Sequence, residues 1–483
     1  MTLSENLNNA STPAPPRMAL RKTVFVGPVI QCKSLSELDI CLHGAIGVDE
    51  NGKIAWVTRK QPAGLEKEWQ EARWIYLGEN EFFFPGFIDT HIHASQYPNA
   101  GVFGKSTLMD WLDTYTFPLE SSFADLSVAR RVYSRVVART LSHGTTTAAY
   151  YATTHVPATN LLADICAARG QRALVGRVCM DRLSPPTYRD ETPSASLAAT
   201  KSCIAHIRAL DPTSSLITPI ITPRFAPSCT AETLSALGAL AQQENLPTQT
   251  HISENASEIA LVRELFPSHA SYAAVYDAHG LLTPRSILAH AIHLSAEERA
   301  LIKARGAKVS HCPASNAALT SGRLRTRQLL DEGIDVGLGT DVSGGYTASV
   351  LAEAREAVLC SRHVAMEGDE TAKLAVEEGL WLATRGGARV VGLEGRVGGF
   401  EVGMEWDAQL VRLGGVGEDG ELGDEEEGLV EVFGGESWED KVAKWVYTGD
   451  DRNTVAVWVK GRLVHQRRGF GKVRIVEGDE KRV

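Results

Sequence analysis

The stretch FPGFIDTHIHASQ, residues 84–96, decides how the rest of the chain is interpreted. In an extended strand successive side chains alternate between two faces, so His91 and His93 point to one face and Ile92 to the other. Asp89 falls on the same face as the two histidines. Two imidazoles placed in this way can bind one metal ion. The alternative is a buried strand with two hydrogen-bonded histidines, so further ligands have to be sought elsewhere in the chain.

Composition describes an ordinary globular protein with one unusual segment. The 483 residues suffice for a catalytic domain and a smaller one, and 43% are hydrophobic and 22% charged. The net charge is −10, and eleven acidic residues lie between Arg412 and Lys441 with no basic residue among them. The rest of the chain is therefore nearly neutral, which predicts neither a nucleic-acid nor a membrane partner. The acidic run over 418–440 is interpreted as a solvated loop.

Cysteine usage and the chain ends bear on the compartment. The eight cysteines are scattered without a CxxC pair, which is typical of reduced thiols in a cytoplasmic protein. Residues 1–20 are rich in Asn, Ser, Thr and Pro, lack the apolar core of a secretory signal, and are predicted to be a disordered tail. No apolar run approaches the length of a membrane span.

Residues 84–395 alternate between apolar strand-like runs and helix-like segments, which predicts an α/β fold with parallel strands. Three helical segments are predicted at 126–142, 231–245 and 296–305. The candidate strands number eight, which favours a (β/α)8 TIM-like barrel over a doubly wound open sheet; they are 84–91, 144–150, 172–179, 216–222, 246–251, 286–290, 307–311 and 334–340.

Strand-like segments also lie near both ends of the chain, at 23–30, 45–58, 407–413 and 454–465. Their positions on either side of the central unit predict a small β-sandwich domain formed from both termini. We therefore expect a composite β domain over 21–83 and 396–483 around a (β/α)8 hydrolase domain over 84–395.

A (β/α)8 barrel builds its active site at the carboxyl ends of its strands. The predicted strands end repeatedly in residues that can do chemistry, namely His91 and His93, Arg224 and Phe225, His251 followed by Glu254, His290, and Asp341. Imidazoles with one carboxylate suit zinc, with iron or cobalt next. Residues 216–227 contain no lysine that could bridge two metals. One ion per subunit, Zn²⁺ rather than Fe²⁺, is therefore expected on His91, His93, His251 and Asp341.

With these residues identified, the chain resembles the amidohydrolase superfamily, most closely its guanine deaminase branch. The histidine and aspartate set is shared across the superfamily, whereas HASQY, PRFAPSC and WLDTYTFPLE single out the guanine branch. The resembling stretches run from the first predicted strand nearly to the end of the chain: PGFIDTHIHASQY (85–97), DWLDTYTFPLE (110–120), PRFAPSC (223–229), THISEN (250–255), HCPASN (311–316), GLGTDVSGGY (337–346) and TGDDRN (448–453).

The resemblance implies hydrolytic deamination of guanine to xanthine and ammonia, in purine catabolism, by a homodimer. Glu254 matches the proton-transferring acid/base, and His290 matches the histidine that orients the attacking water. Asp341 would join them in catalysis besides binding metal. The guanine would contact Gln96, Arg224, Phe225, His251, Glu254 and Asp341. One departure from the family pattern HCPNSN is Ala314, a position without a ligand role.

The chemistry of these residue types agrees with that reading. A bound divalent metal supplies hydroxide at ordinary pH by lowering the pKa of its water. One carboxylate, Glu254, can accept the water proton and deliver it to ring N3 and the leaving amine. Arg224 offers rigid donors for a carbonyl such as guanine O6, and Gln96 can donate and accept along a purine edge.

Each of these assignments has an alternative. Glu254 could be an acid at a helix N-terminus, Arg224 could pair with a structural carboxylate, and Phe225 could be core rather than a ring-stacking residue. At the level of the whole chain, the alternatives are a hydrolase acting on another purine, a pyrimidine or a triazine, and a catalytically silent scaffold that binds partners.

Overall fold

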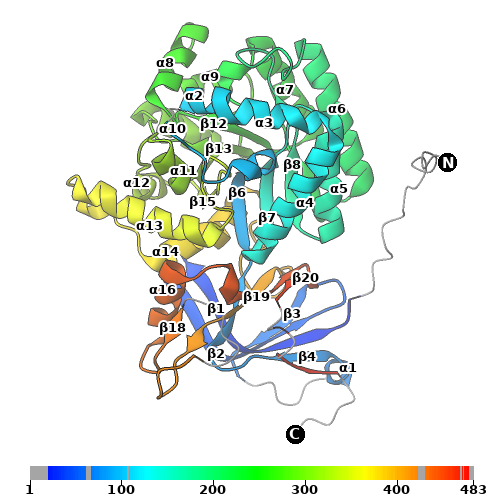
Figure 1. Ribbon diagram of the computed structural model, residues 1–483, viewed down its shortest axis with the longest axis vertical. Helices are drawn as coiled ribbons and strands as arrows, with labels where there is room; N and C mark the ends of the chain where they lie inside the picture. Colours follow the sequence, from blue (N-terminus) through cyan, green and yellow to red (C-terminus); the bar gives the residue numbers. More distant parts are fainter. Residues whose placement is uncertain are drawn as a thin grey trace, which may run out of the picture.

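The computed structural model describes residues 20–60, 67–105, 108–422, 430–467, 470 and 473–477. Nearly all of the predicted disordered tail and the centre of the acidic run lie outside the described residues. Figure 1 shows an upper unit in which helices surround strands, and a lower unit in which strands from the two ends of the sequence lie together.

The upper unit contains two four-stranded parallel sheets. In the first, the order is β10-β8-β7-β6, and in the second the strands follow their sequence order. This arrangement confirms the predicted α/β class. The strands are β6 (Phe87–His93), β7 (Thr145–Tyr151), β8 (Arg172–Gly176), β10 (Ile217–Pro219), β12 (Thr248–Ile252), β13 (Ser286–His290), β14 (Lys308–His311) and β15 (Val336–Leu338).

Long helices connect these strands and cover their outer side (Figure 1). The predicted helices 126–142 and 296–305 are found with the same bounds, and the predicted helix 231–245 ends one residue earlier. The main helices of this layer are α4 (Leu126–Ser142), α5 (Val156–Arg169), α6 (Pro193–Leu210), α7 (Ala231–Glu244), α8 (Ala256–Leu265), α9 (Tyr272–Ala278), α10 (Ala296–Arg305) and α13 (Val350–Met366).

Backbone contacts join the two sheets along both of their edges. On one side a parallel bridge links Ile221 to Thr248. On the other, the backbone N–H of Asp341 donates to His91 O at 2.8 Å, and that of His93 donates to Val342 O at 3.1 Å. The arrangement is therefore TIM-barrel-like, although the strand ladder itself is not continuous around all eight strands.

The first predicted strand, 84–91, is wrong in its bounds, because the chain changes sheets at Gly86. Strand β5 (Glu81–Pro85) pairs with β16 (Ala408–Arg412) in the lower unit, and β6 begins at Phe87. A Cβ atom on residue 86 would lie 2.1 Å from the Thr146 side chain, so only glycine fits there. Apolar side chains continue without interruption across this break, so the sequence pattern did not reveal it.

The lower unit is one nine-stranded mixed sheet built from both ends of the chain. Its apolar core includes Phe25, whose ring stacks on that of Trp406 at 4.3 Å. Strand β1 is its branch point, since it pairs with β2, β4 and β5. The strands other than β5 and β16 are β1 (Thr23–Ser34), β2 (Glu37–Val48), β3 (Ile54–Thr58), β4 (Arg73–Tyr76), β19 (Thr454–Val459), β20 (Arg462–Gln466) and β21 (Arg474–Val476).

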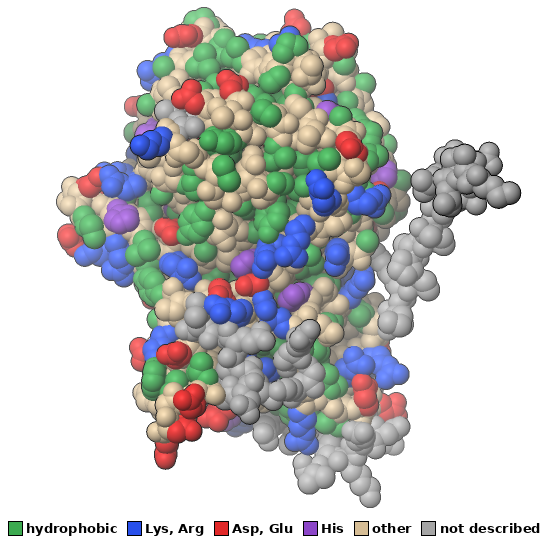
Figure 2. All heavy atoms as spheres, in the orientation of Figure 1, with side chains coloured by type: hydrophobic (Ala, Val, Ile, Leu, Met, Phe, Trp, Pro, Cys, Tyr) green, Lys and Arg blue, Asp and Glu red, His purple; other side chains and the backbone are tan. Residues whose placement is uncertain are grey.

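The acidic run is only partly the solvated loop that its composition predicts. Residues 417–422 are exposed, and acidic side chains gather at the lower left corner of the face in Figure 2, below the position of β18 (Glu431–Val432) in Figure 1. Farther along, α16 (Trp438–Thr448) begins inside the run, with the backbone N–H of Asp440 donating to Ser437 Oγ at 3.1 Å. Its Trp445 ring stacks on Phe87 at 5.8 Å. The prediction of a loop was wrong for the part of the run that forms α16, because it rested on the charge of the run and not on the spacing of its apolar residues.

All eight cysteines are free thiols, and seven of them are buried. Among the described residues, no helix is long and apolar enough to cross a membrane.

Candidate metal centre and substrate pocket

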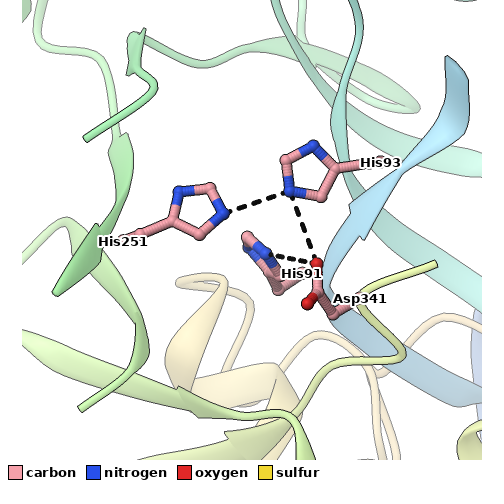
Figure 3. Close-up of side chains that lie close together, drawn as sticks. All are labelled: His91, His93, His251 and Asp341. Atoms are coloured by element: carbon pink, nitrogen blue, oxygen red, sulfur yellow. Dashed lines mark hydrogen bonds and ion pairs between the residues drawn. The ribbon is translucent and has the colours of Figure 1, made fainter. Parts of the chain in front are cut away.

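Four side chains from three strand ends converge on one point (Figure 3). Strand β6 supplies His91 and His93, β12 supplies His251, and Asp341 follows β15. One ligand atom from each lies within 4.8 Å of all the others. His93 Nε2 is 3.1 Å from His251 Nε2, and Asp341 Oδ1 is 3.1 Å from His91 Nε2. These are the four residues that the sequence predicts as ligands, and the structure brings them together.

The donor set fits a divalent metal ion. Burial lowers the pKa of all three histidines, which favours the neutral imidazole that binds metal. Nδ1 of His251 lies 2.6 Å from the carbonyl of Arg224, a contact in which the ring nitrogen donates and its Nε2 is left for a ligand role. Asp341 Oδ2 accepts from Ser315 Oγ at 2.6 Å, which orients the carboxylate. Three imidazoles and one carboxylate suit zinc.

Asp89, which alternation predicts on the face of His91 and His93, lies outside the four-residue group, and the strand register of β6 is irregular between Asp89 and Ile92. Its carboxylate accepts from the backbone N–H of Thr340 at 3.0 Å and from Thr340 Oγ1 at 2.6 Å. Burial raises the pKa of Asp89 to about 7. Asp89 thus fixes the segment that carries Asp341, in agreement with its fully buried position.

Glu254 and His290 lie beside the metal-ligand group. Glu254 Oε2 is 3.6 Å from His290 Nε2, and Glu254 Oε1 accepts from Ser321 Oγ at 2.9 Å. Burial raises the pKa of Glu254. Burial alone would lower the pKa of His290, but the carboxylates of Glu254 and Asp341 outweigh it and raise the pKa. Nδ1 of His290 contacts Asn316 Oδ1 at 2.8 Å.

The alternative role for Glu254, an acid at a helix N-terminus, belongs to another residue. Helix α8 begins after Asn255, and its capping box is formed by Asn255 and Glu258. Glu254 precedes the cap, and its carboxylate points toward His290 and Ser321 instead.

A pocket of about 390 Å³, partly open to solvent, lies over this group. Every predicted site residue lines it except His91, which lies buried beneath. Phe225 is at once a pocket residue and part of an apolar cluster with Trp111 and Leu112. The lining residues are His93, Gln96, Leu108, Trp111, Leu112, Arg224, Phe225, His251, Glu254, His290, Leu319 and Asp341.

Several residues at the site were not predicted from the sequence. The apolar wall comes largely from α2 (Leu108–Trp111) and the π-helical turn Leu112–Thr116, which overlap the stretch 110–120 that carries the family resemblance but that predicts no site residue. Glu120 in α3 (Phe117–Ser121) accepts a hydrogen bond from Arg224 NH1 at 2.6 Å. Arg224 therefore does pair with a buried carboxylate, as its alternative reading proposes, while it also lines the pocket.

A TIM-barrel-like unit that gathers three histidines and an aspartate at its strand ends, with a glutamate alongside, defines a metal-dependent hydrolase. The model of the amidohydrolase family matches residues 82–464, and the chain belongs to this family.

Similar proteins confirm the resemblance to guanine deaminases. The chain is 51% identical over 448 residues to a probable guanine deaminase of Schizosaccharomyces pombe, covering 91% of this chain and 83% of that protein. It is 40% identical over 449 residues to guanine deaminase of Homo sapiens, covering 91% and 96% of the two chains. The crystal structure of guanine deaminase from C. acetobutylicum with bound guanine in the active site is 34% identical, with a TM-score of 0.82, and the match covers 92% of this chain and 100% of that one.

Proposed function

We propose that this protein hydrolyses guanine to xanthine and ammonia. The observation that carries the proposal is a pocket that lies over the four-residue ligand group and is lined by Gln96, Arg224, Glu254 and His290. The named guanine deaminases that align over most of the chain support the same substrate.

The metal is proposed to be one Zn²⁺ per subunit, held by His91, His93, His251 and Asp341, with Fe²⁺ as the alternative. When bound, such an ion lowers the pKa of its water and so supplies hydroxide at neutral pH. This ligand set is supported by the distances between the four donor atoms, which all lie within 4.8 Å of one another.

Glu254 is proposed to carry the proton. It takes a proton from the water that adds to guanine C2 and delivers it to ring N3, so that C2 carries both the new hydroxyl and the amine. It then moves the hydroxyl proton to the amine, the C2–N bond breaks, and ammonia leaves as the C2=O group of xanthine forms. His290, 3.6 Å from Glu254 and 3.8 Å from Asp341 Oδ2, would orient that water. Asp341 is proposed to accept a hydrogen bond from the same water.

Gln96, Arg224 and Phe225 are proposed to hold the base. Arg224 and Gln96 donate to its oxygen and nitrogen acceptors, and the Phe225 ring supplies an apolar face against it. The Phe225 ring lies 6.4 Å from that of His251, which places an aromatic face beside the ligand group.

The same proposal covers the organisation of the chain. We infer a closed (β/α)8 barrel over 84–395, supported by the backbone bonds across both sheet edges. The branched sheet from 21–83 and 396–483 is proposed to form a small β sandwich around Phe25 and Trp406.

A cytoplasmic location is supported by eight free cysteines. The homodimer that the resemblance implies stays a prediction, which light scattering would check.

The test is ammonia release from guanine, adenine, cytosine and 8-oxoguanine, each with and without a metal chelator. Release from guanine that stops with chelator and returns with Zn²⁺ is the expected result. Release from another base in preference to guanine would contradict the substrate assignment and keep the hydrolase class. Metal binding without release from any base would favour the scaffold alternative.

A further inference from the structure

Glu120 lies at the centre of a buried hydrogen-bond network behind the polar wall of the pocket. Its carboxylate is fully buried, and it receives three donors from three different segments. Oε1 accepts from Gln96 Nε2 at 2.8 Å. Oε2 accepts from Arg224 NH1 at 2.6 Å and from Tyr188 OH at 2.8 Å. Glu120 itself is not among the residues that line the pocket.

The network fixes which way the Gln96 amide faces. The backbone N–H of Ser343 can only donate, and it donates to Gln96 Oε1 at 3.2 Å. The amide nitrogen therefore faces Glu120, which can accept one of its two N–H groups. Among the described residues, nothing accepts from the second N–H group, and Gln96 lines the pocket. Gln96 thus offers a donor to a bound molecule.

The network also fixes the Arg224 guanidinium. Arg224 is 3% exposed, and its side chain has one hydrogen-bond partner among the described residues, Glu120. Its remaining N–H groups have no hydrogen-bond acceptor among the described residues, and Arg224 lines the pocket, so it can donate to a bound molecule. Burial by itself would lower the pKa of Arg224, but the Glu120 carboxylate outweighs this and raises it. The guanidinium therefore stays protonated, the Glu120 carboxylate balances its charge, and the hydrogen bond between them fixes its orientation.

We propose that Glu120 is a positioning residue that makes this wall of the pocket a pair of hydrogen-bond donors and so selects bases with two neighbouring acceptors. Guanine has such an edge in O6 and N7, whereas adenine has a donor amine at the position of O6. The inference rests on the proposed function, because it assigns Gln96 and Arg224 to the substrate.

Glu120→Gln tests the proposal, because it keeps the size of the side chain and turns one acceptor into a donor. The readout is the ratio between the inhibition constant of 2-aminopurine, which lacks O6, and the KM of guanine. We expect the KM of guanine to rise about tenfold or more and the inhibition constant of 2-aminopurine to change much less. The ratio of the inhibition constant to the KM therefore falls. Metal content should not change. If Glu120 only stabilised the fold, the variant would weaken the binding of guanine and of 2-aminopurine by the same factor.

Glu353→Gln is the matched control. Glu353 is another fully buried carboxyl, on α13, and it accepts from the backbone N–H of Ala314 at 3.1 Å without contacting Gln96 or Arg224. In the Glu353→Gln variant, the ratio of the inhibition constant of 2-aminopurine to the KM of guanine should equal that of the parent. An unchanged ratio in a folded Glu120→Gln enzyme would overturn the proposal.

Tyr188→Phe decides the matter if Glu120→Gln does not fold. This variant removes one hydrogen bond to Glu120 and keeps the ion pair with Arg224. A fall in the ratio that is smaller than the one expected for Glu120→Gln supports the proposal, and an unchanged ratio overturns it. If the metal-loaded parent deaminates no guanine, the proposed function fails by itself. Calorimetric binding of guanine and 2-aminopurine to the parent and the variants then gives the same ratio without turnover.

Discussion

Glu254 separates binding from turnover at the scale of one residue. Glu254→Gln keeps the shape of the side chain and the contact with Ser321, but an amide cannot carry the proton. We expect kcat to fall by about 10²–10⁴-fold, while metal content and the dissociation constant of guanine stay close to those of the parent. Steady-state kinetics with metal analysis and calorimetry would measure all three.

Glu264→Gln is the control for that variant, since Glu264 is exposed on α8, close in sequence to Glu254. Its kinetics should match the parent. A Glu254→Gln enzyme with the kcat of the parent would show that another group transfers the proton.

Residue types at strand ends made the ligand group predictable from the sequence. His91, His93, His251 and Asp341 each follow or end a strand whose apolar pattern is visible, and parallel strands bring such ends together. Glu120 and Ser321 were not predictable in the same way. Their contacts join segments 104 and 67 residues apart, to Arg224 and Glu254 respectively, and no local pattern encodes such pairs.

At the scale of one element, the first turn of α8 contains a pH-sensitive cap. Glu258 accepts from the backbone N–H groups of Glu254 and Asn255 and from Tyr272 OH. Burial and the nearby Glu254 charge raise its pKa to about 7 from 4.5. The folded protein thus binds this proton more tightly than the unfolded chain. The stability from this group is full below about pH 4.5 and is lost as the pH rises through about 7.

Glu258→Gln should remove that dependence, because the neutral amide keeps an acceptor for the cap without a titrating charge. Relative to the variant, the parent is expected to lose up to about 3 kcal/mol of stability between pH 5 and pH 8. Melting temperatures of both metal-loaded proteins across this range, with Glu264→Gln as the non-capping control, would measure the difference. Melting curves that stay parallel from pH 5 to pH 8 would contradict the prediction.

Two helices with their own caps, 126–142 and 296–305, were predicted to the residue, whereas bounds that depend on other segments were not. Helix α10 starts with a capping box of Ser295 and Glu298 that is visible in the sequence. The split at Gly86 depends on the approach of Thr146, a tertiary contact that alternation and composition do not record. Helix α16 differs, because its capping box of Ser437 and Asp440 is visible in the sequence, and it was missed because charge was weighed before apolar spacing.

At the scale of the whole molecule, a buried ion cluster ties the two units together. Arg172, at the start of β8, donates to both carboxylate oxygens of Asp407 at 3.1 Å and is paired with Glu405. All three residues are at most 5% exposed. The backbone N–H of Lys460 also donates to Asp407 at 2.7 Å. The parallel unit and the sheet built from the chain ends therefore share one charged core.

Arg172→Met should destabilise the protein without altering its chemistry. The variant leaves the buried carboxylate of Asp407 without a guanidinium, whereas Glu405 keeps its ion pair with Arg396 at 2.9 Å, and the loss costs about 3–5 kcal/mol. Because Arg172 lies at the opposite end of its strand from the ligand group, the KM of the folded enzyme should not change. Arg208→Met is the control, since the Arg208–Glu244 pair is 43% and 26% exposed and is worth at most about 1 kcal/mol. Thermal unfolding and kinetics of the two variants would measure both effects, and equal melting temperatures would show that Arg172 does not hold the two units together.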